Sequence, residues 1–482
     1  MVRQNRRLLI RGAELWTSGS AGPRADVLIK QGVIARIAAD ITPRDDDCVI
    51  DAKGGLLLPG LHDHHVHLAG LAVRAQSLWC GPPGVTDEAE LREALASTAG
   101  SGWIRGIGYH ESVLGELPDA LTLDRFVADR PLRMQHRSGR MWLLNTAALD
   151  LLLATSDPPP GLEREHGRFT GRLFDADAWL REALGSAPPD LAAVSAELAR
   201  LGVTGVTDMT PQNGADMAMH FTSQRESGAL LQKLTLAGAL DLADAPQHGW
   251  TLGPFKLHLH EADLPPFDEA AALIRAAHDQ GRSAAIPCVS EVEIVFALAL
   301  LDHAGAVLGD RIEHASIASP VHVLQLACMG VAVCVQPHFI AERGDRYLAD
   351  VEPRLHGDLY RLQSLRAAGI ALAGGSDAPF ALPDPWAAMR AAVSRKTLAD
   401  QVISANEALS PEAALALWLA DPADLSHQRE VALGAPADLC LLARPWREVR
   451  ENFAPDDVVL TLVSGQIVHQ LVNQSPVVRA PR

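Results

Sequence analysis

The sequence lacks the features of a membrane or secreted protein. It contains no uninterrupted run of about 18 apolar residues, so no membrane span is expected. Its basic N-terminal stretch, MVRQNRRLLIRGAELW, is broken by Arg11 and Glu14 before an apolar signal-peptide core forms. We therefore predict a cytoplasmic protein without a membrane partner.

Paired cysteines and an excess of positive charge are also missing. The six cysteines lie mostly in apolar runs, without paired spacing, at Cys48, Cys80, Cys288, Cys328, Cys334 and Cys440. This pattern favours reduced core thiols over a disulfide framework. The net charge of −17 argues against nucleic acid as a partner. A small molecule is the predicted partner, and a homo-oligomer is left open.

Two β-rich ends flank a middle in which strands and helices alternate. Short alternating runs in residues 1–58 and 430–482 predict a small β domain assembled from both ends of the chain. Residues 59–429 hold eight apolar strand candidates, the number that a (β/α)₈ barrel requires. The predicted fold class is therefore α/β, a TIM-like barrel with a terminal β domain. Residues 75–198, between the first two strands, are too long for a simple connection and predict an ordered insertion.

The segment GLHDHHVHL places His65 and His67 two residues apart near a strand end. On a strand, residues i and i+2 point to one face, so both imidazoles can reach a single ion. The spacing alone is equally typical of a chance polar pair, because His62 and His64 alternate in the same way. The position favours a metal site, since the catalytic groups of a barrel lie at the C-terminal ends of its strands.

Lysine is scarce, and one lysine interrupts an apolar strand. It occurs only at Lys30, Lys53, Lys233, Lys256 and Lys396, whereas arginine is plentiful. Lys256 lies in the apolar pattern PFKLHLHE, where an unpaired ammonium is costly. Burial leaves a lysine as a nucleophilic amine, which can add carbon dioxide to form a carbamate that bridges two metal ions. A lysine at a strand edge that reaches solvent is the alternative.

Two later strand ends carry further candidate ligands. His314, in DRIEHAS, could supply another nitrogen, with Arg311 or Glu313 either supporting it or forming a surface ion pair. Asp377 ends the run IALAGGSDAPF, where small residues allow close approach and an unpaired carboxylate is unfavourable. We predict that Asp377 is a metal ligand and the general base. A helix N-cap is the alternative for this aspartate.

Taken in order, these motifs resemble the amidohydrolase superfamily, in particular its branch of metal-dependent hydrolases that includes N-substituted formamide deformylases. The resemblance runs through PGLHDHHVH, FKLHLHE, DRIEHAS, GSDAPF and GAPADLCLL, and so covers nearly the whole chain. It implies HxH on strand 1, a carboxylated lysine on strand 4, a histidine on each of strands 5 and 6, and an aspartate on strand 8. The metal ligands implied in this chain are His65, His67, Lys256, His314 and Asp377, holding one or two divalent ions, with zinc expected.

One position departs from the family pattern. Strand 5 reads AAIPCVSEVE, so Pro287 stands where a histidine is expected, and proline offers no side-chain ligand. Either the site holds one ion and His314 contacts substrate, or a substitute ligand completes a two-ion site. The candidate substitutes are His258, His260, Cys288 and Glu291. A degraded site in a non-catalytic protein is the third alternative.

The insertion and loops supply candidate substrate contacts. They are Tyr109, His110, His136, Arg137 and His338. Members of the branch resemble this sequence at several of these places, although such residues also close loops with ordinary hydrogen bonds.

The predicted function is hydrolysis of a C–N bond in a non-peptide amide, imide, or N-acyl or N-formyl compound through metal-activated water. Asp377 would carry the proton to the leaving nitrogen, and His314 is a candidate oxyanion donor. A mononuclear deaminase-type enzyme is the alternative within enzymes. A non-catalytic small-molecule binder is the alternative outside them.

Overall fold

The computed structural model describes residues 7–82, 84–185 and 188–471. These residues divide into two compact units, one within Met1–Leu68 and Asp190–Arg482 and the other within Ala69–Pro189. None of the helices in the described part of the chain is long and apolar enough to cross a membrane.

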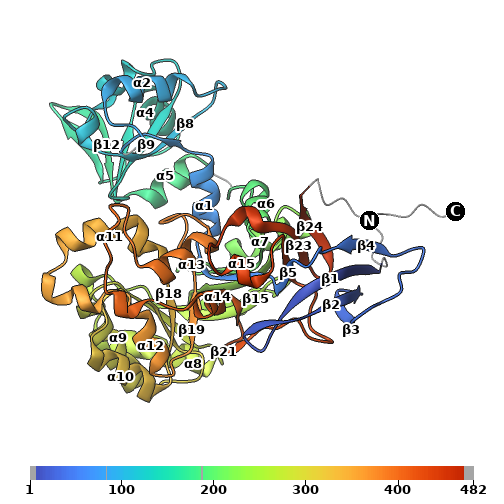
Figure 1. Cartoon of the computed structure of the whole chain (residues 1–482). Coiled ribbons are helices and arrows are strands. Elements are labelled where there is room, and N and C mark those ends of the chain that lie inside the picture. Colours follow the sequence, from blue (N-terminus) through green and yellow to red (C-terminus); the bar gives the residue numbers. More distant parts are fainter. Residues whose placement is uncertain (1–6, 83, 186–187, 472–482) are drawn as a thin grey trace. The chain divides into compact units, whose positions relative to one another are not determined.

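A sheet of eight parallel strands forms the barrel of the first unit (Figure 1). Its strands in sheet order are β19 (Leu372–Gly374), β18 (Ala332–Val335), β17 (Arg311–His314), β16 (Ala284–Cys288), β15 (Thr251–Lys256), β14 (Lys233–Gly238), β13 (Val203–Asp208) and β6 (Leu61–Val66). Helices such as α8 (Phe267–Asp279), α9 (Glu291–Ala304) and α10 (Pro320–Met329) connect these strands. The predicted barrel is confirmed, with one strand for each predicted apolar run.

The barrel closes where its first and last strands end. The backbone N–H of Asp377 donates to the carbonyl of His65 at 2.6 Å, and the N–H of His67 donates to the carbonyl of Ala378 at 2.8 Å. Gly375 permits this approach, because a Cβ there would lie 2.5 Å from the Cβ of His65. The small residues of GGSDA therefore allow the first barrel strand, β6 (strand 1), to pack closely against the segment that follows the last, β19 (strand 8).

Two strands end earlier than the sequence pattern indicates. β15 pairs with β16 only through Phe255 and Lys256, so the ladder has no partner beyond that point. His258 and His260 are exposed, and His260 instead caps the 3₁₀ helix η3 (Glu261–Asp263). Because β15 ends at Lys256, strand alternation does not place these two histidines, which are candidate substitute ligands, on the face of Lys256. Similarly, β6 ends at Val66, so His67 follows the strand directly.

A second sheet joins the two ends of the chain, as predicted (Figure 1). It contains β1 (Leu8–Thr17), β2 (Ser20–Lys30), β3 (Val33–Ala38), β4 (Cys48–Asp51), β5 (Leu56–Pro59), β22 (Leu439–Leu442), β23 (Val458–Val463) and β24 (Gln466–Gln470). The N-terminal and C-terminal strands meet where β5 pairs antiparallel with β22. One hydrophobic cluster spans residues from both ends, including Ile10 and Leu441. The limits 1–58 and 430–482 for a separate domain stay a prediction.

The second unit is built on its own sheet. This sheet contains β7 (Leu78–Trp79), β8 (Ile104–Tyr109), β9 (Leu132–His136), β10 (Met141–Leu144), β11 (Leu162–Glu165) and β12 (Arg168–Phe174). Two hydrophobic clusters, one including Tyr109 and the other Trp142, pack within the unit.

Candidate metal centre

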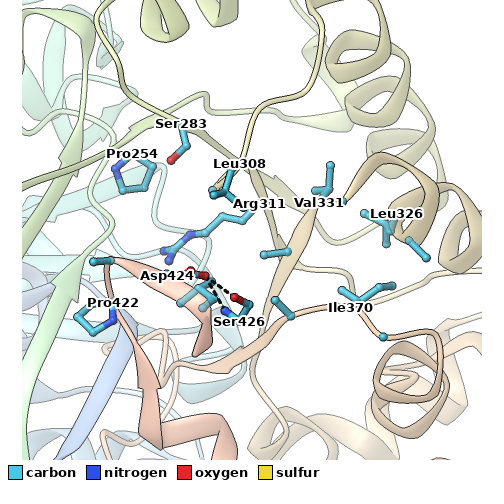
Figure 2. A pocket seen from close by; sticks show the side chains of 18 residues that line it. Pro254, Ser283, Leu308, Arg311, Leu326, Val331, Ile370, Pro422, Asp424 and Ser426 are labelled. Carbon is cyan, nitrogen blue, oxygen red and sulfur yellow. Dashed lines mark hydrogen bonds between the residues drawn. The ribbon is translucent and has the colours of Figure 1, made fainter. Parts of the chain in front are cut away.

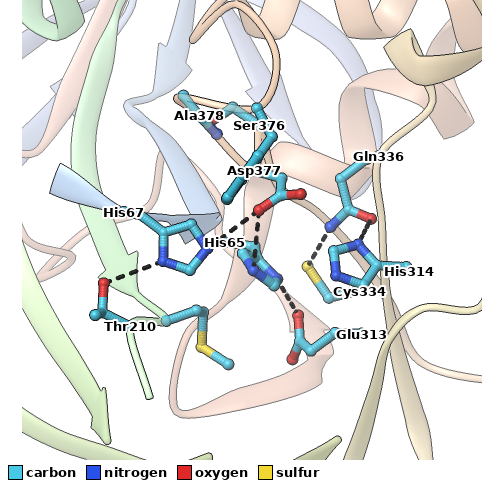
Figure 3. Close-up of polar contacts among 12 residues, drawn as sticks. His65, His67, Thr210, Glu313, His314, Cys334, Gln336, Ser376, Asp377 and Ala378 are labelled. Atoms are coloured by element: carbon cyan, nitrogen blue, oxygen red, sulfur yellow. Dashed lines mark hydrogen bonds and ion pairs between the residues drawn. The ribbon is translucent and has the colours of Figure 1, made fainter. Parts of the chain in front are cut away.

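Three predicted ligands converge at the C-terminal end of the barrel (Figure 3). The Nε2 atoms of His65 and His67 lie 3.4 and 3.2 Å from the same carboxylate oxygen, Oδ1 of Asp377. His65 and Asp377 are buried, and His67 is half-buried. Two nitrogens and one carboxylate facing a common point are a donor set that suits zinc, which takes about 2 Å bonds to such atoms.

The other ring nitrogen of His65 is held by a buried ion pair. Glu313 accepts a hydrogen bond from Nδ1 of His65 at 2.6 Å, and Nε of Arg311 lies 2.5 Å from its second oxygen. Burial acts to raise the pKa of Glu313, but Arg311, His65 and Lys256 together lower this pKa well below its usual range and keep the carboxylate ionised. Burial lowers the pKa of His65 to about 3, so the ring is neutral. Its proton therefore sits on Nδ1, and the lone pair of Nε2 is free for a metal.

The remaining site histidines are held through Nδ1 in the same way. Nδ1 of His67 lies 3.0 Å from the hydroxyl of Thr210, whose backbone N–H is bound by Asp208 at 3.0 Å. Nδ1 of His314 lies 2.8 Å from Oε1 of Gln336. The ring of His314 is 4.9 Å from that of His65, and burial lowers its pKa. Both rings are thus oriented by partners that leave Nε2 unoccupied.

Two site residues have unusual backbone conformations. His314 has φ 70° and Asp377 has φ 52°, both in the left-handed region that residues with a Cβ seldom adopt. Asp377 does not cap a helix, because α13 (Pro385–Ser394) is capped by Asp384. Local strain at two neighbouring buried polar residues is typical of functional sites.

Lys256 is buried beside this cluster without a hydrogen-bond partner. It is 5% exposed, and its Nζ is among the described buried polar atoms that lack a partner. Burial lowers its pKa, while Glu313 and Asp377 nearby oppose that change. An orphaned amine at the end of strand 4 fits the chemistry of a carbamate ligand.

A second group of candidate ligands consists of His65, Glu313 and Cys334. Glu313 in this group already binds the Nδ1 side of His65. Cys334 is fully buried, and burial raises the pKa of its thiol well above the usual range. A neutral thiol offers no thiolate to a metal.

The proposed substitutes for the missing strand-5 ligand do not join the cluster. Pro287 lies in β16, as predicted from the sequence. His258, His260, Cys288 and Glu291 belong to neither group of candidate ligands found in the described residues. Burial raises the pKa of the Cys288 thiol, and the carboxylate of Glu291 lies 3.9 Å from Arg354.

The four substrate residues predicted in the insertion lie in the second unit. Tyr109 is buried in its core and donates to the carbonyl of Glu116 at 2.8 Å. His110 and His136 each accept a backbone N–H at Nδ1, so their Nε2–H groups face Glu111 at 3.6 and 3.0 Å. Arg137 is exposed. Their contact with substrate stays a prediction.

His338, the fifth predicted substrate residue, lies next to the metal centre. It begins α11 (His338–Asp350), is 2% exposed, and its Nε2 donates to the carbonyl of Ser376 at 2.8 Å. Burial lowers its pKa to about 4. The ring therefore supports the backbone that carries Asp377, and a direct role in binding substrate stays a prediction.

A model of the amidohydrolase family matches residues 48–469 of this chain. The chain belongs to the amidohydrolase family. It is 26% identical to the N-substituted formamide deformylase of Arthrobacter pascens, over 92% of this chain and 94% of that protein. It is 25% identical to the putative amidohydrolase YtcJ of Bacillus subtilis, over 87% and 90% of the two chains. An uncharacterized metal-dependent hydrolase from Pyrococcus horikoshii has the same fold, with a TM-score of 0.77, 20% identity and coverage of 92% and 99%.

Family membership makes this amidohydrolase an enzyme, and the family is generally metal-dependent. The sequence motifs had indicated the superfamily, and that prediction is confirmed. The interpretation as a non-catalytic binder has no support from the family match.

Several supporting residues of this amidohydrolase were not found from the sequence. Gln336 and Thr210 hold histidine rings, and Asp63 accepts the backbone N–H groups of His65 and Ser376 at 3.1 and 2.9 Å. Burial raises the pKa of Asp63 to about 7. Gln336 directly follows β18 and Thr210 comes shortly after the end of β13, and this position after a buried barrel strand is a signal that could have identified them.

Proposed function

We propose that this amidohydrolase cleaves a C–N bond of a non-peptide small molecule, an amide, an imide, or an N-acyl or N-formyl compound. The convergence of His65, His67 and Asp377 carries this proposal. Its relative in Arthrobacter pascens, named as an N-substituted formamide deformylase, supports the substrate class. We expect a zinc ion held by these three residues, with His314 and a carbamate on Lys256 as further ligands.

A bound divalent ion would lower the pKa of a water molecule and polarise the substrate carbonyl. Asp377 would accept the proton of such a water molecule, because its carboxylate is held ionised beside two histidines. The same carboxyl can return the proton to the leaving nitrogen, which departs as an amine. This sequence of steps consumes water and yields a carboxylic acid and an amine from an amide, or a single ring-opened product with a carboxylic acid and an amide from a cyclic imide.

His314 suits a ligand role better than that of an oxyanion donor. Its Nδ1 is taken up by Gln336, and burial keeps the ring neutral, so Nε2 carries a lone pair and no proton. A group without a proton cannot donate to a developing oxyanion. The ring of His314 lies 4.9 Å from that of His65 between centroids, close enough for both to belong to one site.

Substrate profiling with zinc-loaded protein tests the proposal. The panel would contain N-substituted formamides, cyclic imides and N-acyl amines, with carboxylic acid and amine quantified separately. From at least one of these classes we expect the balanced products, which are equal amounts of acid and amine from a formamide or N-acyl amine and one ring-opened acid amide from a cyclic imide. Zinc-loaded protein that turns over no member of the panel would contradict the proposal.

A mononuclear deaminase-type reaction is the second candidate. It is favoured by the absence of a compact ligand group around Pro287 among the described residues, which leaves one clear ion site. Aminated heterocycles added to the panel separate the two reactions. Ammonia release from these compounds, without hydrolysis of amides, would favour the deaminase.

A further inference from the structure

A cavity of about 300 Å³ opens at the N-terminal ends of the barrel strands (Figure 2). Its lining includes Ser283 and Val331, which directly precede β16 and β18, and Ile370, which lies shortly before β19. The metal centre lies at the other ends of these strands. The cavity is therefore separate from the catalytic face of the barrel.

The walls of the cavity are mostly apolar. Leu308, Leu326, Val331 and Ile370 line one side, together with glycines and alanines that leave room for a ligand. The turn and strand around β21 (Asp424–Gln428) form the other side. The volume is at the lower end of the range for small-molecule pockets, which is about 300–1,000 Å³.

One buried cation reaches this cavity from the barrel interior. Arg311 is 4% exposed, its Nε contacts Glu313, and its Nη2 donates to the carbonyl of His64 at 3.0 Å. Nη2 also donates to Sδ of Met209 at 2.9 Å, whereas Nη1 makes no hydrogen bond within the described part of the chain. Figure 2 shows the guanidinium extending across the cavity toward Pro254 and Asp424. Nη1 is therefore the nitrogen of this guanidinium that remains available to a ligand.

Asp424, at the cavity rim, does not form an ion pair with Arg311. Its carboxylate accepts the backbone N–H and the hydroxyl of Ser426 at 3.0 and 2.6 Å. It also lies 2.7 Å from Nδ1 of His427. The described residues show no ion pair between Asp424 and Arg311.

We propose that this cavity binds a small monocarboxylate with an apolar tail. The carboxylate would accept a charge-assisted hydrogen bond from Nη1 of Arg311, which is stronger than a bond between neutral groups. The tail would cover Leu326, Val331 and Ile370. An anion without a tail, such as inorganic phosphate, would leave these apolar walls uncovered. The proposal is independent of the substrate cleaved at the metal centre.

Calorimetric titration of the full chain with sodium hexanoate tests this site. We expect a Kd of about 1 mM or tighter, as is usual for a ligand of this size. Hexanamide, which has the same tail without the charge, should bind at least about tenfold more weakly, because hydrogen bonds to charged groups are the stronger ones. Inorganic phosphate should also bind more weakly than hexanoate.

A matched pair of variants on α10 locates the binding. Ala327 lines the cavity, and Ala327→Phe should fill it and weaken hexanoate binding at least about tenfold. Leu324 is on the same helix, is 64% exposed and does not line the cavity, so Leu324→Phe should bind as the unchanged protein does. The methyl resonance of Ile370 should shift on titration of the unchanged protein, which provides a measurement that needs no variant.

Several results would overturn the proposal. They are no binding of hexanoate, equal affinity for hexanamide or phosphate, an Ile370 methyl resonance that does not respond, or a folded Ala327→Phe variant with unchanged affinity.

Discussion

At the scale of single residues, the tautomer of each histidine separates the metal centre from other histidine clusters. His65 donates through Nδ1 to Glu313, so its Nε2 carries a free lone pair. His110 and His136 accept backbone N–H groups at Nδ1, so their Nε2 atoms carry protons. The first arrangement can bind a metal through Nε2, and the second directs N–H groups at Glu111. The amino-acid sequence does not distinguish these two environments, because the partners are distant in the chain or belong to the backbone.

Replacing Asp377 with alanine should abolish turnover while the fold survives. The variant loses both a ligand and the proton carrier, so we expect a fall in kcat of roughly 10³-fold or more. Steady-state kinetics and the melting temperature would be measured together. His427→Ala, which alters an exposed histidine, is the control and should keep full activity. Substantial activity in a zinc-loaded Asp377→Ala variant would show that the site is assigned wrongly.

The charge of Glu313 should matter for metal affinity. Glu313→Gln keeps the shape of the side chain but weakens its hold on Nδ1 of His65, so zinc affinity should fall by about 10- to 100-fold. The apoprotein should also lose about 3–5 kcal/mol of stability, because Arg311 is left buried without a counter-ion. Competition with a chromogenic chelator measures the first effect and urea unfolding the second. Glu412→Gln, remote from the site, is the control and should keep its zinc affinity. If Glu313→Gln also left the zinc affinity unchanged, the proposed role of Glu313 would be refuted.

At the scale of elements, the junction of strand 1 with strand 8 has two roles. It closes the barrel, and it brings the metal ligands together. The backbone hydrogen bonds between His65 and Asp377 and between His67 and Ala378 involve the same segments that carry three ligands. Strand ends were predicted within a few residues, but the close approach at Gly375 depends on the tertiary structure. Periodicity in one segment carries no information about the distance to another segment.

Gly375→Ala tests this junction. The new Cβ would lie 2.5 Å from His65, so we expect about 1–3 kcal/mol of destabilisation and weaker zinc binding. Gly357→Ala is the matched control, because a Cβ there meets nothing within 4 Å. Urea unfolding of both variants gives the comparison, and equal stability of the two would argue against a strained junction.

Pro287→His tests the register of strand 5. Pro287 is paired with Glu313, and Ala285 is paired with both Lys256 and Arg311, so these side chains share one face of the sheet. A histidine at this position should stand beside Lys256 and allow a second ion to bind. Metal analysis should then rise from about one to about two ions per chain. A content that stays at one would mean that Pro287 is not at the position of the missing ligand.

At the scale of the whole molecule, the sequence predicted the barrel well and the insertion poorly. Several barrel strands, such as β13 and β18, are short runs that are buried on both faces, and such runs can be recognised locally. The same holds for His65, Lys256, His314 and Asp377, because each stands at the end of such a run. The sheet of the second unit lacks this regular alternation, and its strands were not assigned from the sequence.

The metal content of the unchanged protein is the most direct test of the account. The chain would be stripped with a chelator, reloaded with zinc, freed of excess metal and analysed by mass spectrometry, with His65→Ala treated in parallel. The convergence of His65, His67 and Asp377, without a strand-5 histidine, predicts about one tightly bound ion per chain and almost none in the variant. No bound zinc in the unchanged protein, or equal zinc in the two proteins, would contradict the proposed centre.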